Sequence, residues 1–272
     1  MSAVKEATYT HGHSEAVLRS HSWRTAANSA AYLLPHLKPD MSILDVGCGP
    51  GTISADLATY VPQGHVTALD SAAGVLENAR AHAAGRSISN ITFAAGDAHA
   101  LPFADASFDV VHAHQVLQHI ADPVQALREM RRVARPGGIV AVRDVDFRAT
   151  GWWPESADMD RWLALYLRVA RANGGTPDAG RRLHVWAREA GFDPAKVACS
   201  AGTWCYHTPE ERAWWGGLWA ERTLKSNFAP SAIKHGLATQ EDLEHISQTW
   251  KTWEADQDGW MTMVHGEIIC RV

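Results

Sequence analysis

Residues 45–52 read DVGCGPGT, and they continue the short apolar run that begins at residue 42. Glycines at 47, 49 and 51 let the backbone bend sharply and approach a ligand closely, because glycine has no side chain. Residues 52–60 have a helical pattern of apolar residues. The turn therefore joins a buried strand at residues 42–46 to a helix N-terminus, where backbone N–H groups are available to a ligand.

Strand-like and helix-like segments alternate after this turn. Further strands are expected at residues 65–69, 91–95, 108–113 and 139–145, and helices are expected at residues 71–84, with Ser71 as the cap, and 123–134. The strands are continuous apolar runs, as is typical of strands that are buried on both faces. This alternation predicts a parallel sheet with helices on both sides.

Composition excludes several classes of protein. Of the 272 residues, 46% are hydrophobic and 20% are charged, which is typical of a globular protein. The net charge of −5 is not the basic balance of a nucleic-acid-binding protein. No apolar run approaches the roughly 20 residues of a membrane span, and residues 1–10 do not resemble a signal peptide. We therefore expect a cytoplasmic protein that neither inserts into membranes nor binds nucleic acid.

No metal site is expected. The four cysteines (Cys48, Cys199, Cys205 and Cys270) form no CxxC pair. His11, His13 and His21 suggest a metal, but no carboxylate or cysteine lies near them at a spacing that suits zinc.

Asp70 adds to the signal of the glycine-rich turn. It ends the second strand, where an acidic residue can accept hydrogen bonds from ribose hydroxyls. A dinucleotide fingerprint needs a third glycine at position 52, but that residue is Thr52. The Asp45 carboxylate would also repel a pyrophosphate. These features favour an adenosine-containing ligand that carries positive charge.

Five segments in this order resemble the motif series of class I S-adenosylmethionine-dependent methyltransferases. They are DVGCGPGT, ALD, AAGDAHALPF, FDVVHAHQVLQHI and LREMRRVARPGGIVAVRD, within residues 40–146. The resemblance is greatest to the ubiquinone/menaquinone-biosynthesis type and to other small-molecule methyltransferases. It implies S-adenosyl-L-methionine as the cofactor and methyl transfer as the reaction.

The resemblance also implies which residues bind the cofactor. Gly47 and Gly49 would line its methionine portion with Asp45 near its amino group, Asp70 and Ser71 would lie at the ribose, Asp97 and the Ala98 backbone would meet the adenine, and Gln115 would face the methionine portion. Arg24 is either a partner of the cofactor carboxylate or an exposed surface arginine.

Methyl transfer from a sulfonium is a direct displacement, so the enzyme must align the acceptor and exclude water. A hydroxyl acceptor would benefit from a base, for which His114 and His119 are the candidates; the alternative is that both are polar residues with no proton role. Trp152 and Trp153 follow the fifth strand and are the candidates for an acceptor pocket, although they could instead pack helices onto the sheet. We expect an aromatic or apolar small molecule whose acceptor atom (O, N, S or C) is open.

The second half of the chain has a different composition from the first. Of 12 tryptophans, only Trp23 precedes residue 150. Helices are expected at residues 158–172, 178–190, 209–225 and 239–255, and strands at 196–206 and 260–272. An amphipathic helix is expected at residues 22–34.

The expected fold is therefore a doubly wound α/β domain with a seven-stranded, mostly parallel sheet, an added N-terminal helix and a C-terminal helical insertion. We expect residues 1–272 to form one domain. Residues 1–40 would be a helical lid, 41–146 the cofactor-binding core, and 147–272 a roof over the acceptor with the last two strands.

Two other function classes stay open. One is a macromolecule methyltransferase, which the acidic net charge disfavours. The other is a cofactor-binding regulatory module without catalysis, which intact cofactor motifs do not exclude. A dinucleotide-dependent oxidoreductase is disfavoured by Thr52. The sequence does not indicate an oligomeric state.

Overall fold

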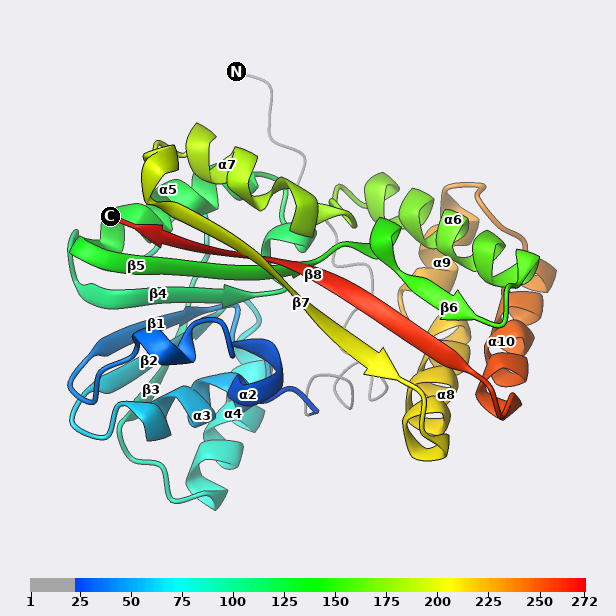
Figure 1. Ribbon diagram of the computed structural model, residues 1–272, viewed down its shortest axis with the longest axis horizontal. Helices are drawn as coiled ribbons and strands as arrows, with labels where there is room; N and C mark the ends of the chain where they lie inside the picture. The colour runs from blue at the N-terminus through cyan, green and yellow to red at the C-terminus, as the bar shows by residue number, and fades with distance from the viewer. Residues whose placement is uncertain (1–22) are drawn as a thin grey trace.

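A single mixed sheet organises the computed structural model, which describes residues 23–272 (Figure 1). Its strands are β1 (Ser42–Val46), β2 (His65–Asp70), β3 (Ile91–Ala95), β4 (Phe108–His114), β5 (Ala134–Val145), β6 (Gly151–Trp153), β7 (Val197–Tyr206) and β8 (Trp260–Arg271). The order is β3-β2-β1-β4-β5-β8, with β6 and β7 also paired to β8. Strands β1 to β5 are parallel to their neighbours, and β8 runs antiparallel to β5, β6 and β7.

The predicted α/β fold is confirmed, but the predicted number of strands is wrong by one. The sheet has eight strands, because the three residues of β6 pair with Trp260 to Thr262 of β8. Strand β5 pairs with the following part of β8, from His265 to Arg271. Thus β5 and β6 share one edge of β8, while β7 occupies the other edge.

Helices connect and cover the strands. The α-helices are α2 (Ala26–Ser29), α3 (Thr52–Tyr60), α4 (Ala73–Gly85), α5 (Pro123–Val133), α6 (Ala157–Ala172), α7 (Leu183–Glu189), α8 (Pro209–Lys225), α9 (Phe228–Lys234) and α10 (Gln240–Ala255). Short 3-10 helices are η1 (Leu34–His36), η2 (Leu117–His119), η3 (Phe147–Ala149), η4 (Ala179–Arg182) and η5 (Pro194–Lys196). The helix expected at residues 178–190 is divided between η4 and α7, and α9 was not expected.

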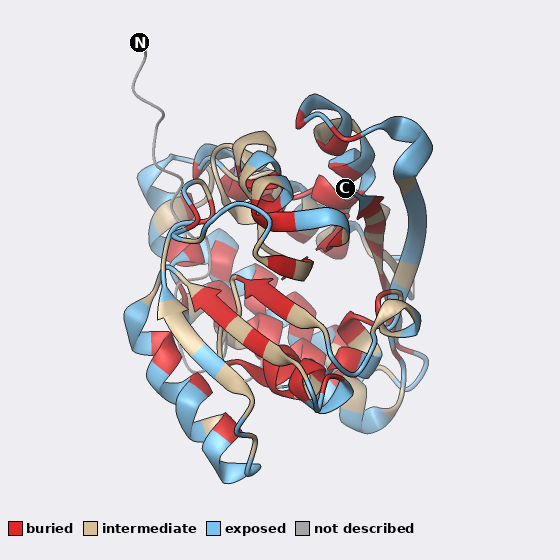
Figure 2. Cartoon of the chain, turned by 90° about the vertical axis from the view of Figure 1, so that its left-hand side faces the viewer, coloured by how far each residue is buried: buried red, intermediate tan, exposed pale blue. Residues whose placement is uncertain are grey.

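Both faces of the sheet are buried, as the continuous apolar strands predict. Ile43 of β1 packs on one face with α3, and its neighbour Leu44 packs on the other face with α5 and α7. Figure 2 shows buried residues along the central strands and exposed residues on the outer sides of the surrounding helices. The sheet therefore forms a rigid base whose strand ends can hold a site.

The continuous N-terminal helix predicted for residues 22–34 is wrong. Helix α2 has only four residues, from Ala26 to Ser29, and a turn leads on to η1. The Asn28 carbonyl, which would accept from the Tyr32 N–H in a continuous helix, instead accepts from Arg143 Nη1 at 2.8 Å and Trp204 Nε1 at 2.9 Å. Tertiary contacts thus replace the helical ladder at this residue.

One helix cap was also assigned wrongly. Ser71 does not cap α4, because the N-cap is Ala72 and no side chain bonds to this helix end. By contrast, Asp122 caps α5 by accepting from the Gln125 N–H, with Pro123 in the first turn.

Helices α6, α8, α9 and α10 lie together at one end of the molecule, next to β6 and the far ends of β7 and β8 (Figure 1). Most of the tryptophans gather there: Trp162, Trp219 and Trp250 are fully buried and contact one another edge-on or stacked. This aromatic core explains the tryptophan-rich second half of the chain. None of the helices formed by residues 23–272 is long and apolar enough to cross a bilayer.

Candidate active site

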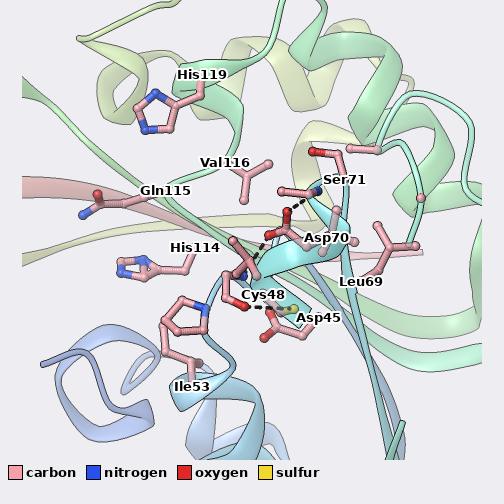
Figure 3. A pocket seen from close by; sticks show the side chains of 18 of the residues that line it. Asp45, Cys48, Ile53, Leu69, Asp70, Ser71, His114, Gln115, Val116 and His119 are labelled. Atoms are coloured by element: carbon pink, nitrogen blue, oxygen red, sulfur yellow. Dashed lines mark hydrogen bonds between the residues drawn. The ribbon is translucent and has the colours of Figure 1, made fainter. Parts of the chain in front are cut away.

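A cavity of about 270 Å³ opens at the C-terminal ends of β1, β2 and β4 (Figure 3). Open α/β sheets bind ligands at this edge, and sites for small molecules typically measure roughly 300–1,000 Å³. The cavity is lined by every residue that the sequence predicts for cofactor binding or catalysis: Arg24, Asp45, Gly47, Gly49, Asp70, Ser71, Asp97, Ala98, His114, Gln115 and His119. Apolar lining residues that the sequence did not single out include Ile53, Leu69, Val75, Val116 and Ile120.

The glycine-rich turn forms the floor of this cavity. Gly47, Gly49 and Gly51 have φ angles of 70°, 53° and 77°, in the left-handed region that glycine adopts without strain. A Cβ atom on Gly47 would lie 2.4 Å from Val116 Cγ2, so the turn also packs too closely to η2 for a side chain. The glycine at this position therefore serves both conformation and packing.

Asp70 lies where β2 ends, beside the glycine turn. Its carboxylate accepts hydrogen bonds from the Gly49 N–H and the Ala72 N–H, each at 2.9 Å. A carboxylate oxygen can accept more than one hydrogen bond. Asp70 can therefore brace the turn and still accept from hydroxyls of a ligand in the cavity.

Two further carboxylates line the cavity in different surroundings. Asp45 is 3% exposed, and its oxygens accept from His112 Nδ1 at 2.8 Å and from the Ser54 hydroxyl. Asp97 lies nearer the surface and is bonded to His99. Partial burial would raise the pKa of Asp97, but the hydrogen bonds and charge of His99 outweigh burial and lower that pKa. Asp97 is therefore ionised at neutral pH.

His114 lies on the other side of the cavity, together with Gln115 and His119 (Figure 3). It is 6% exposed, and neither ring nitrogen has a hydrogen-bond partner. Burial lowers the pKa of His114 well below its usual value, and the charges of Arg24 and Arg143 lower it further. His114 is thus a neutral imidazole that can both donate and accept a hydrogen bond.

His119 is also neutral. Burial, followed by the charges of Arg24 and Arg222, lowers the pKa of His119 to about 3. Arg24 itself donates from Nη2 to the Gln115 Oε1 at 3.1 Å. This side of the cavity therefore combines positive charge with uncharged hydrogen-bonding groups.

The structure places Trp152 and Trp153 outside the cavity lining. The ring centroids of Trp152 and Trp162 are 6.2 Å apart, in the hydrophobic cluster formed with α6, α8, α9 and α10. Trp153 is 53% exposed. Their place on β6, which extends along β8 away from the sheet centre, explains the difference from the sequence prediction.

Different aromatic residues lie beside the site. Trp204 of β7 contacts His114 at 5.8 Å between ring centroids and Trp23 at 5.3 Å. Arg24 lies 5.7 Å from the centre of the Trp204 ring. Trp204 was one of many tryptophans in the sequence, and nothing local distinguished it.

Two buried polar residues were also missed. Arg143 of β5 pairs with Glu267 of β8, with Nε and Oε1 3.2 Å apart. His265 of β8 lies 3.0 Å from Gln115, between Nε2 atoms. Arg143 could have been suspected, because Arg143 and Asp144 are charged residues in an otherwise apolar run at residues 139–145.

No group of three or more His, Cys, Asp or Glu side chains that could hold a metal occurs within residues 23–272. His11, His13 and His21, which the sequence analysis considers as possible metal ligands, lie outside the described residues.

The donor set fits the expected cofactor. Carboxylates on one side suit hydroxyls and cationic groups, and Arg24 on the other side suits a carboxylate. The unpartnered nitrogens of His114 are buried polar atoms, which are costly unless a ligand pairs with them. These features are what a zwitterionic adenosine compound requires.

Comparisons with known proteins identify the family of the chain. Residues 37–190 match the family model of a methyltransferase domain. An uncharacterized methyltransferase of Schizosaccharomyces pombe is 34% identical over 268 residues, which cover 96% of this chain and 95% of that protein. A demethylmenaquinone methyltransferase of Beutenbergia cavernae is 35% identical over 158 residues, which cover 58% of this chain and 60% of that enzyme.

The fold comparison gives the same result. The crystal structure of a candidate methyltransferase from Bacillus halodurans superposes with a TM-score of 0.57 at 21% identity, over 89% of this chain and 97% of that one. At this identity the likeness bears on the fold alone, whereas the sequence matches bear on the family. The chain belongs to the class I S-adenosylmethionine-dependent methyltransferases, and its cofactor is S-adenosyl-L-methionine.

Proposed function

We propose that this enzyme transfers a methyl group to a small aromatic or apolar acceptor that carries an ionisable hydroxyl. One observation carries the proposal: His114 lines the cavity as a buried, neutral imidazole with neither nitrogen bonded. A buried imidazole of this kind needs a partner that donates or accepts a hydrogen bond. A hydroxyl does both.

The carboxylates would hold the cofactor. We assign Asp70, with Ser71 beside it, to the ribose hydroxyls, and Asp97 with the Ala98 backbone to the adenine. Asp45 is buried and its oxygens already accept from His112 and Ser54, so it would act on the amino group through its negative charge.

The remaining contacts would orient the methionine portion. Gly47 and Gly49 let the turn approach it closely, and Arg24, held by Gln115, would pair with its carboxylate. The bound cofactor supplies an electrophilic methyl group on a sulfonium. The residues of this chain have to align the acceptor with that methyl group and exclude water.

The proton balance assigns a role to His114. As the acceptor oxygen forms its bond to the methyl carbon, the carbon–sulfur bond breaks, and S-adenosylhomocysteine is the leaving product. The hydroxyl proton passes to the unprotonated ring nitrogen of His114. Arg24 and Arg143, whose charges lower the pKa of His114, would also stabilise the negative charge that develops on the acceptor oxygen.

His119 has a different proposed part. His114 presents two unpartnered ring nitrogens, so we assign the base to His114 and place His119 as a hydrogen-bonding residue of the acceptor pocket. Trp204, which contacts both His114 and Trp23 just outside the cavity lining, would provide aromatic packing behind His114. Such aromatic surroundings suit a planar, uncharged acceptor.

A panel of matched acceptors tests the proposal. Each set contains a phenol or enol, its O-methylated form and the corresponding amine, and the products are identified by mass spectrometry. We expect one added methyl group on the hydroxyl compounds only. Methylation of the amines in preference to the hydroxyl compounds would contradict the proposed acceptor. Cofactor binding without any product would favour a regulatory module.

A further inference from the structure

A chain of hydrogen bonds crosses the site from β8 to the N-terminal segment. His265 of β8 approaches Gln115 at 3.0 Å, and Gln115 Oε1 accepts from Arg24 Nη2 at 3.1 Å. These three side chains come from segments that are 150 and 91 residues apart in the sequence. Gln115 and Arg24 line the cavity, whereas His265 lies behind them and is fully buried.

The hydrogen bonds determine which nitrogen of His265 carries the proton. Nδ1 lies 3.1 Å from the Met263 carbonyl oxygen, which can only accept, so Nδ1 is the donor. Burial lowers the pKa of His265 well below its usual value, with the charges of Arg143 and Arg24 acting in the same direction. The neutral ring therefore has its lone pair on Nε2, which faces the Gln115 amide.

The tautomer of His265 in turn determines the orientation of the Gln115 side-chain amide. Gln115 Nε2 donates to His265 Nε2, and Oε1 consequently faces Arg24. A flipped amide would place two acceptors together at His265 and two donors together at Arg24. Gln118 adds a longer contact to the same oxygen, at 3.4 Å.

The backbone and a neighbouring ring hold Gln115 and His265 in place. Gln115 has a positive φ of 54°, and its N–H donates to the Arg143 carbonyl at 2.7 Å. The His265 ring packs 4.3 Å from that of Trp204. The backbone bond fixes the point from which the Gln115 side chain extends, and the His265 ring cannot turn away without losing its contact with Trp204.

We propose that His265 is a positioning residue of the cofactor site. Through the Gln115 amide, it holds the Arg24 guanidinium against the cavity wall, where it meets the carboxylate of the cofactor. This inference rests on the proposed contact between Arg24 and that carboxylate. His265 itself touches neither the cofactor nor the acceptor.

Two ligands separate positioning from general structural damage. S-adenosylhomocysteine carries the carboxylate, and 5′-methylthioadenosine has the same nucleoside and sulfur without the amino acid portion. In His265→Phe, the phenyl ring keeps the contact with Trp204 but removes the acceptor nitrogen. We expect calorimetry to give about 3- to 10-fold weaker binding of S-adenosylhomocysteine, which corresponds to one hydrogen bond, and unchanged binding of 5′-methylthioadenosine.

A double variant tests whether His265 acts on the cofactor through Arg24. In an Arg24→Met background, His265→Phe should cause no further loss of S-adenosylhomocysteine affinity, because the group that it positions is absent. Ile268→Val, which trims a buried side chain of the same strand, serves as the control and should bind both ligands like the wild type. Equal losses for the two ligands, or additive losses in the double variant, would overturn the inference.

A measurement without ligand keeps the two proposals distinguishable. Nitrogen-15 chemical shifts of His265 should show the Nδ1–H tautomer between pH 6 and 8. The Nε2–H tautomer would refute the positioning chain even if the enzyme binds its cofactor as proposed. The Nδ1–H tautomer together with a wild-type protein that fails to bind S-adenosylhomocysteine would instead contradict the proposed function.

Discussion

His112 Nδ1 donates to Asp45 Oδ1 at 2.8 Å, and this buried pair joins β4 to β1 directly below the glycine turn. The two residues are also register partners in the sheet. In His112→Leu, Asp45 Oδ1 would lose its donor without gaining access to water. We expect a loss of about 1–3 kcal/mol in the free energy of unfolding, measured with urea.

His99→Leu is the matched control, because it removes a similar hydrogen bond to Asp97 at the surface. The Asp97 side chain is 64% exposed, so water replaces the lost donor and the cost should stay below about 1 kcal/mol. Equal losses of unfolding free energy in His112→Leu and His99→Leu would show that burial does not strengthen the contribution of the His112–Asp45 pair to stability.

Gly47→Ala tests the geometry of the turn. The new methyl group meets Val116 Cγ2 at 2.4 Å, and the φ of 70° is strained for alanine. We expect a loss of about 1–3 kcal/mol in unfolding free energy, together with weaker cofactor binding. Adding Val116→Ala removes the clash but not the strain, so it should restore only part of the stability. Full recovery in the double variant would show that the positive φ is unimportant.

Asp70→Ala tests the proposed ribose contact. We expect S-adenosylhomocysteine to bind more weakly by about 1–3 kcal/mol, the scale of hydrogen bonds to a charged group. An analogue without the two ribose hydroxyls should lose much less affinity through the same substitution. Similar losses for both ligands would instead show that Asp70 acts only by bracing the turn through Gly49 and Ala72. Asp105→Ala, an exposed acid of another loop, is the control.

Asp144 of β5 predicts a pH dependence of stability. Burial raises its pKa to about 7, although the Gln118 and Leu117 N–H groups oppose this shift. The unfolded value is about 3.9, so between these values the folded chain binds a proton that the unfolded chain does not. Asp144 therefore contributes stability that is present at pH 4 and is lost as the pH rises to about 7.

Asp144→Asn should remove this slope, so that its unfolding free energy relative to the wild type rises from pH 5 to pH 7.5 in urea titrations. Asp109→Asn provides the opposite case, because hydrogen bonds from Ser42 and Arg135 outweigh partial burial and lower the pKa of Asp109. The loss of unfolding free energy in Asp109→Asn should be present at neutral pH and should disappear as the pH falls below about 3.9. An unchanged slope in Asp144→Asn would show that this carboxyl group is ionised in the folded protein at neutral pH.

Features that depend on neighbours in the sequence were predictable. The strand that contains Asp45, the glycine turn and Asp70 are local patterns, and the structure brings their residues to one cavity. The short strand β6 was missed because three residues show no periodicity, and β8 supplies its pairing. The N-terminal helix was overestimated because Arg143 and Trp204 bond to the Asn28 carbonyl.

The acceptor side of the site was less predictable for the same reason. His265 reaches Gln115 across 150 residues, and Trp204 approaches His114 through the pairing of β7 with β8. Neither residue belongs to a local motif. By contrast, Trp152 and Trp153 were selected because they follow the fifth strand, but on β6 Trp152 packs against the cluster that contains Trp162 and Trp153 is exposed.

The most direct test of the account compares the wild type with His114→Ala, using methyl-labelled S-adenosylmethionine and a hydroxyl acceptor found in the matched panel. The wild type should place the label on the acceptor oxygen and release S-adenosylhomocysteine. His114→Ala should lower kcat by about 10²-fold or more, the scale of a lost general base, with unchanged affinity for the cofactor. Turnover equal to that of the wild type at every pH, or label on another atom of the acceptor, would contradict the role of His114 in hydroxyl methylation.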